Sequence, residues 1–223
     1  VILMFSIDYI DFFKELARNN LKEWFNENRK RYEKSEKKLF KNFVTDLLIE
    51  IQKIDSEVQI EAKEAIFKVN RGIRFAKDKT PYKIQMSAII SPGGRKNKEA
   101  PGLYIEVSPE NFTIYGGVRQ LSKDNLLELR SYIATRNKEF SNLISDKTFS
   151  NNFGGILGEK SKRIPVELKE AGAKQELIYN KSFYFIKTLP PETLLREDLI
   201  PLLIEQYKIA LPFNQFVRKA IHY

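Results

Sequence analysis

The apolar residues of this chain repeat with two different periods, and this change limits the fold more than any other feature. A repeat of three to four positions over residues 6–18, 20–54 and 122–133 indicates helices with one apolar face. Short β-branched and aromatic runs between residues 65 and 117, and again over 182–188, indicate strands. We therefore predict the α+β class, with a mostly antiparallel sheet and flanking helices, one long N-terminal helix and a C-terminal helix.

The predicted elements follow one another without a linker, an internal repeat or a low-complexity block. A hairpin turn is expected at residues 108–111, where Ser-Pro-Glu-Asn separates two apolar runs. The chain is long enough for one large core, since area scaling predicts that about 70% of the unfolded surface is buried on folding. We therefore expect residues 1–223 to form a single α+β domain.

Three further expectations concern the helices. Residues 33–38 are the most polar part of the helix predicted over 20–54, so we expect a kink there. Trp24 lies on the apolar side of that helix and is expected to be buried. The last helix begins near Asp198 and is expected to be interrupted at Pro212, because proline has no amide hydrogen to donate.

Composition argues against several kinds of catalytic and metal site. The chain has no Cys, which excludes disulfide scaffolds, thiol catalysis, zinc ribbons and iron–sulfur clusters. Its single histidine is His222, so neither a Ser-His-Asp triad nor a multi-histidine metal site is expected. The chain also lacks a P-loop, a dinucleotide-binding glycine motif and an EF-hand loop. We predict no metal and no cofactor.

No secretion signal or membrane-spanning segment is expected. Residues 1–5 are apolar, but no cations precede them as they would in a secretion signal. The longest other uncharged apolar run, residues 199–204, is far shorter than the roughly 20 residues that cross a bilayer. We therefore expect a cytoplasmic protein without a membrane partner.

Positive charge is concentrated in residues 68–98. This stretch holds nine cations and one acid, Asp78, and so carries +8 of the net charge of +9. Because a solvated surface normally mixes both signs, we interpret the excess as a binding feature. We predict that one anion site is formed by the cations between residues 71 and 83 together with a tyrosine: Arg71, Arg74, Lys77, Lys79, Lys83 and Tyr82.

Each residue type in this segment has a chemical role in the prediction. Arg71 and Arg74 are expected to clamp a planar or tetrahedral anion, because guanidinium forks are pre-organised and stay charged. Lys77 and Lys79 flank a turn and act as mobile point charges, while Asp78 between them stays ionised and orients them.

Two alternatives remain open for these residues and their aromatic neighbours. The cations can instead pair internally with helix carboxylates such as Glu23, Glu27 or Glu61. Tyr82, Tyr104 and Tyr115 are candidates for stacking on nucleic-acid bases, although alternation along strands is expected to bury some of them.

Several segments form a pattern over nearly the whole chain, and the most specific of them is RFAKDKTPYK at residues 74–83. The others are NNLKEWF at 19–25, NRKRYE at 28–33, GLY at 102–104, GG at 116–117 and KSF at 181–183. In identity and order these segments resemble the bacterial domain-of-unknown-function family numbered twenty-four sixty-one. The resemblance implies a family without an established activity, and it covers the same basic segment that the charge distribution singles out.

Three classes of function are consistent with these observations. The first is an anion-binding protein that takes a phosphorylated ligand or a nucleic acid through residues 71–83, and we favour it. The second is a histidine-free enzyme, in which Arg and Lys stabilise an anion while a carboxylate or Tyr moves protons. The third is a scaffold that docks an acidic protein partner. A pocket that holds both cations and a carboxylate favours the enzyme, and an open basic stripe favours nucleic acid.

Overall fold

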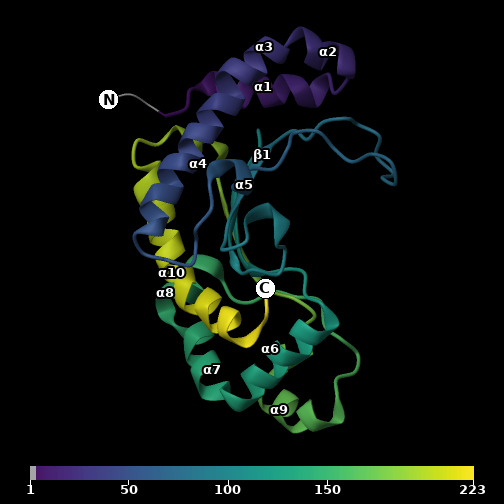
Figure 1. The fold of residues 1–223 in the computed structure, drawn as a ribbon, viewed down its shortest axis with the longest axis vertical. Coiled ribbons are helices and arrows are strands. Elements are labelled where there is room, and N and C mark those ends of the chain that lie inside the picture. Colours follow the sequence, from purple (N-terminus) through teal and green to yellow (C-terminus); the bar gives the residue numbers. More distant parts are fainter. Residues whose placement is uncertain (1–3) are drawn as a thin grey trace.

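The computed structural model describes residues 4–223 and is built around one antiparallel sheet (Figure 1). The strands are β1 (Met86–Ile90), β2 (Gly102–Val107), β3 (Phe112–Val118) and β4 (Phe183–Leu189), and they lie in the order β1-β2-β3-β4. Each strand is antiparallel to its neighbours. The predicted hairpin turn joins β2 to β3, closed by a hydrogen bond from Ser108 N to the Asn111 carbonyl. The predicted α+β class and antiparallel sheet are confirmed.

The helices lie before, between and after the strands. The α-helices are α1 (Ile7–Arg18), α2 (Lys22–Glu27), α3 (Arg29–Arg31), α4 (Lys37–Gln52), α5 (Ala62–Ala65), α6 (Lys123–Thr135), α7 (Asn137–Ser145), α8 (Lys147–Phe153), α9 (Lys169–Lys174) and α10 (Leu199–Ala220). A π-helical turn, η1 (Tyr32–Glu36), joins α3 to α4. Short 3₁₀ turns are η2 (Gly94–Lys96), η3 (Val166–Leu168), η4 (Glu176–Tyr179) and η5 (Pro191–Leu195).

The long N-terminal helix begins later than its sequence pattern predicts. The segments α3, η1 and α4 run without a gap from Arg29 to Gln52, and α2 is a separate helix before them. Asn28 ends α2, because its side-chain amide donates to the Trp24 carbonyl at 2.9 Å and competes with the helical backbone. The π-helical turn Tyr32–Glu36 overlaps residues 33–38, where a kink is expected.

Two helical expectations are corrected. Trp24 is only half-buried and packs against Phe12, whereas the neighbouring Phe25 is 2% exposed. The apolar face of α2 is rotated toward Phe25, so the indole lies at its edge. Helix α10 is not interrupted at Pro212 but continues to Ala220. Buried residues beyond the proline, Phe213 and Phe216 among them, pack tightly enough to offset the missing backbone hydrogen bond.

Helices α4 and α10 lie side by side and cover one face of the sheet (Figure 1). Alternation along the strands points Ala88, Ile105, Ile114 and Phe185 toward these helices, and each of these residues is at most 1% exposed. They belong to one connected apolar cluster that includes residues of α1, α4 and α10. We call this side of the sheet the covered face and the opposite side the open face.

A buried ion pair ties α10 to the loop that follows α4. Arg218 Nη1 lies 2.7 Å from Asp55 Oδ2, and both side chains are 2% exposed. Tyr207 donates to the same carboxylate oxygen at 2.5 Å, and Arg218 also donates to the Pro101 carbonyl. Because both partners of the ion pair are hydrogen-bonded, neither charge is left uncompensated in the interior. The pair therefore holds α10 in position over the sheet.

Candidate functional site

The open face of the sheet carries half-buried aromatic side chains, whereas the apolar side chains of the covered face are fully buried. The strand register places Tyr104 of β2 opposite Tyr115 of β3, and their ring centroids are 5.6 Å apart. Phe67, in the segment that pairs with the edge of β1, lies 5.6 Å from the Tyr104 ring. The three rings are half-buried and form an aromatic surface that α4 and α10 do not cover.

A pocket of about 470 Å³ is hollowed into this face. Its size is within the range of small-molecule sites. It is lined by Phe67, Ile89, Lys98, Ala100, Gly102, Tyr104, Glu106, Tyr115, Gly116, Gly117, Arg119 and Gln120. We call it the sheet-face pocket.

Two adjacent glycines of β3 form part of the pocket wall. Gly117 has a φ of +79°, and a Cβ there would lie 2.2 Å from the Phe183 carbonyl oxygen. A Cβ at Gly116 would lie 2.0 Å from the Phe185 ring on the covered face. Neither position can carry a side chain without a clash, so backbone alone lines the pocket at this point of β3.

The polar groups inside the pocket centre on Glu106. Its Oε2 accepts hydrogen bonds from the Tyr104 hydroxyl at 3.1 Å and from Gln85 Nε2 at 3.4 Å. Burial raises the pKa of Tyr104 to about 12, and burial followed by the Glu106 charge raises the pKa of Tyr115. Both hydroxyls therefore stay protonated at neutral pH: that of Tyr104 donates to Glu106, and that of Tyr115 can donate to a ligand.

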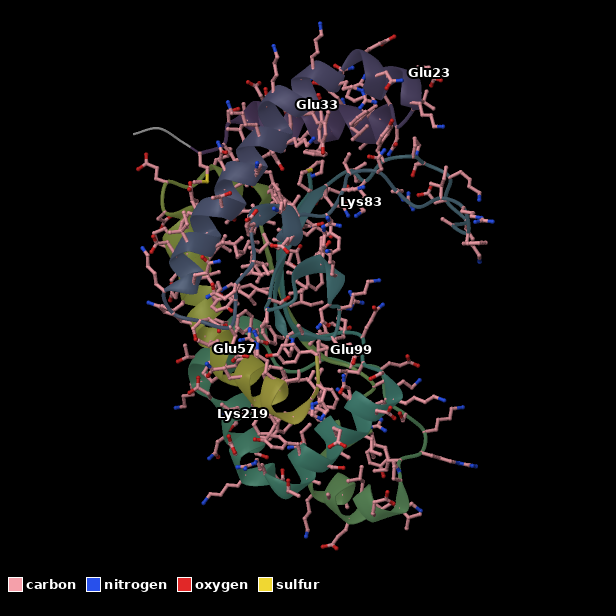
Figure 2. The ribbon with its side chains drawn as sticks, viewed as in Figure 1. Glu23, Glu33, Glu57, Lys83, Glu99 and Lys219 are labelled. Carbon is pink, nitrogen blue, oxygen red and sulfur yellow. The ribbon has the colours of Figure 1, made fainter. Side chains whose placement is uncertain are left out.

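Three cations surround the same aromatic surface. Lys98 and Arg119 line the pocket, and the Arg119 guanidinium carbon lies 4.9 Å from the centroid of the Tyr184 ring. Lys83 Nζ lies 5.4 Å from the centroid of the Phe67 ring. Burial lowers the pKa of Lys83; Glu106 opposes this shift and Arg71 adds to it. Figure 2 shows Lys83 where the chain enters the sheet, on the side away from α4.

The segment with the predicted anion site projects from the sheet as an irregular hairpin (Figure 1). We call residues 68–83 the basic arm. Backbone hydrogen bonds from Lys83 N to the Val69 carbonyl and from Arg71 N to the Pro81 carbonyl hold its two sides together. The structure thus separates the predicted residues along the arm, with Lys83 at its base and Arg74 near its tip.

Within the arm, the predicted residues contact one another in pairs. Arg71 pairs with Asp78 and donates to the Thr80 hydroxyl. Hydrogen bonds from Arg71 and then Thr80 lower the pKa of Asp78 to about 2, so this carboxylate is ionised at neutral pH. Lys79 Nζ donates to the Ile73 carbonyl at 3.0 Å.

The remaining predicted residues have different surroundings. Arg74 stacks over Phe75, with 5.1 Å from the guanidinium carbon to the ring centroid, and Lys77 is exposed. Tyr82 is 5% exposed and stacks on Phe25 with a centroid distance of 4.0 Å. The face that base stacking would need is therefore occupied, and Tyr82 anchors the arm instead.

The ion pairs of residues 4–223 bear on the internal-pairing alternative. Arg71 with Asp78 is the one pair in this described part that involves an arm cation, and none joins the arm to Glu23, Glu27 or Glu61. Glu61 pairs with Lys63. The charge of the arm is thus not neutralised by the neighbouring helices.

Sequence reasoning did not identify Glu106, Lys98 or Arg119 as site residues. Lys98 lies inside the basic stretch counted above, and Tyr104 and Tyr115 were stacking candidates, so part of the pocket has a sequence signal. Arg119 follows the double glycine and lies outside that stretch. Only the pairing of β2 with β3 brings it to the same face as Tyr104.

In residues 4–223, no group of three or more His, Cys, Asp or Glu side chains is placed to hold a metal ion. No helix in this part of the chain is both long and apolar enough to cross a membrane.

Comparison with known proteins identifies a family and nothing more specific. A family model described as "Conserved hypothetical protein (DUF2461)" matches residues 8–216. No curated protein and no solved structure matches the chain. The match covers the sheet, the sheet-face pocket and the basic arm together.

Proposed function

The chain belongs to the DUF2461 family of conserved hypothetical proteins, a description that states no activity, and we propose that it binds a small phosphorylated ligand with a planar ring in the sheet-face pocket. The observation that carries this proposal is the charge balance of an aromatic pocket. Lys98 and Arg119 line the pocket, Lys83 Nζ lies 5.4 Å from the ring of its lining residue Phe67, and Glu106 is the one acidic residue among those that line it. The site therefore attracts anions.

The rings and the cations suit different parts of one ligand. Phe67, Tyr104 and Tyr115 offer faces and edges on which a planar ring can stack. Arg119 presents a planar, permanently charged fork that matches two oxygens of a phosphate group. The protonated hydroxyl of Tyr115 adds a donor. A nucleoside monophosphate combines such a ring with such an anion and serves as the probe for this class.

The test is isothermal titration calorimetry of the protein with AMP, adenosine and inorganic phosphate. We expect AMP to bind more tightly than either half alone, because it engages the rings and the cations together. Arg119→Gln should weaken AMP binding by roughly 10- to 150-fold, the worth of a charged hydrogen bond. The matched control is Lys219→Gln, which removes an exposed cation on α10, away from Lys83 (Figure 2).

Two results would overturn the proposal. One is equal loss of AMP affinity in Arg119→Gln and Lys219→Gln, which would mean that only the overall net charge matters. The other is the absence of binding by AMP and by other phosphorylated ring compounds at millimolar concentration to a folded wild-type protein.

A second function, catalysis on the same anionic ligand, is favoured by the position of Glu106. This carboxylate shares the pocket with cations and accepts a hydrogen bond from the Tyr104 hydroxyl at 3.1 Å. Such a pair can move a proton next to an anion that cations stabilise. If turnover occurs, ³¹P NMR should show a product after the nucleotide is incubated with the wild-type protein. Glu106→Gln should still bind the nucleotide but form no product. Unchanged nucleotide after prolonged incubation would leave binding as the sole function of the pocket.

A further inference from the structure

The tip of the basic arm combines an exposed aromatic ring with unneutralised positive charge. Phe75 is 90% exposed, more than any other large apolar residue in the described part of the chain. The arm carries six cations and one acid, Asp78, which is already paired with Arg71. Cations that are not neutralised repel one another, and a bound polyanion would relieve this repulsion within the arm.

The arm is built to hold this tip away from the core. At its base, the Asn20 side-chain amide donates to the Tyr82 carbonyl at 2.9 Å and accepts from Tyr82 N at 3.1 Å. Farther out, Thr80 N donates to Asp78 Oδ1 at 2.9 Å, and Lys79 closes the tip onto the Ile73 carbonyl. Figure 1 shows the arm extending beyond the helices and the sheet. The aromatic ring is therefore presented outward rather than packed.

The chemistry of the tip matches unpaired bases on a phosphate backbone. The Phe75 ring and the Arg74 guanidinium stacked 5.1 Å from it offer two flat faces, and both aromatic rings and guanidinium planes stack on bases. The exposed Lys77 and the neighbouring Lys79 supply charges for phosphates. A duplex keeps its bases stacked inside, so it cannot use the ring without distortion. An anionic membrane surface is the alternative partner, because a single exposed Phe can also insert into a membrane.

We propose that the basic arm binds single-stranded nucleic acid, with Phe75 and Arg74 stacking on a base and Lys77 and Lys79 contacting phosphates. This goes beyond the proposed function, because it uses a different surface from the sheet-face pocket. Only the base of the arm comes near that pocket, where Lys83 lies over the ring of Phe67.

The test is fluorescence anisotropy with labelled single strands of about twelve nucleotides, oligo-dT and oligo-U, and with a duplex of equal length, between about 50 and 200 mM salt. Phe75→Ala should weaken single-strand binding by roughly 5- to 150-fold. Lys77→Gln should reduce the slope of log affinity against log salt by about 0.7. The matched controls are Val166→Ala, an apolar residue that is 75% exposed, and Lys219→Gln, and both should bind like the wild type.

Three outcomes would overturn the proposal. The first is unchanged single-strand affinity in Phe75→Ala, since stacking would then contribute nothing. The second is duplex binding as tight as single-strand binding, which would reduce the arm to a non-specific basic patch. The third is binding of phosphatidylserine vesicles or polyglutamate with no binding of either single strand, which would assign the arm to a membrane or an acidic protein.

Failure here is separable from failure of the pocket proposal. Phe75→Ala leaves every residue of the sheet-face pocket in place, so calorimetric binding of AMP should be unchanged in this variant. Loss of both AMP binding and single-strand binding in Phe75→Ala, with the fold intact by circular dichroism, would show that the arm and the pocket are one site.

Discussion

The two faces of the sheet share the same strands but have opposite properties. On the covered face, Ile105, Ile114 and Phe185 are at most 1% exposed under α4 and α10. On the open face, Tyr104 and Tyr115 are half-buried and lie next to Glu106 and Arg119. One face therefore supplies the packing energy, while the other has side chains that a ligand can reach. Four substitutions test this division.

The largest effect is expected on the covered face. Phe185→Ala should lower the free energy of unfolding by about 3–5 kcal/mol, because it removes a fully buried ring and leaves a cavity among Phe149, Phe153 and Phe213. Urea unfolding followed by far-UV circular dichroism measures the change. A loss below about 1 kcal/mol would mean that this face does not hold the molecule together.

The next effect concerns the glycine at the boundary between the faces. Gly117→Ala should cost about 1–3 kcal/mol, because a φ of +79° is strained for alanine and the new methyl meets the Phe183 carbonyl. Gly117 N also donates to Asn214 Oδ1 of α10 at 3.2 Å, so a shift of β3 disturbs the covering helix. The same unfolding assay applies. The matched control is Gly72→Ala in the basic arm, where a Cβ meets nothing within 4 Å, and it should be nearly neutral.

A small effect on stability is expected on the open face. Tyr115→Ala should lower the free energy of unfolding by less than about 1 kcal/mol, because its ring is only half-buried and no helix covers it. Binding of AMP should nevertheless weaken, since the variant removes part of the aromatic surface. A loss of several kcal/mol, comparable to that of Phe185→Ala, would contradict the division between the faces.

The smallest effect is a shift in the charge state of one lysine. Burial and the Arg71 cation both disfavour the charged form of Lys83, so its pKa lies below the ordinary lysine value. Arg71→Gln should raise this pKa, measured by an NMR titration of the Lys83 side chain. Because Lys83 is charged only below its pKa, AMP affinity should fall as the pH rises through that value. This fall should occur at a lower pH in the wild type than in Arg71→Gln. An unchanged Lys83 pKa in the variant would show that the base of the arm and the pocket are not electrostatically coupled.

The predicted single domain remains a prediction, and the single tryptophan offers a way to test it. Trp24 reports on the N-terminal helices, while far-UV circular dichroism reports on the whole chain. One domain should unfold with the same midpoint by both signals. Two separate midpoints would show that the N-terminal helices form a unit of their own.

Much of the fold was predictable because it depends on local pattern. The β2–β3 hairpin follows from two apolar runs on either side of a Ser-Pro-Glu-Asn turn, and the helices follow from their apolar period. The errors lie where packing overrides local preference. Pro212 stays inside α10 because Phe213 and Phe216 beyond it are buried, and Trp24 is replaced by Phe25 as the buried residue of α2.

Sequence alone was enough for the α+β class and for the excess of charge in the basic arm, because these depend on composition and on short-range period. Only the tertiary structure decided that Tyr104, Glu106 and Arg119 share one pocket, since strand pairing brings together residues whose positions in the chain show no relation. It also decided that Tyr82 anchors the arm while Phe75 is presented to solvent. The reason is that burial depends on which segments pack against a residue, and no local pattern records that.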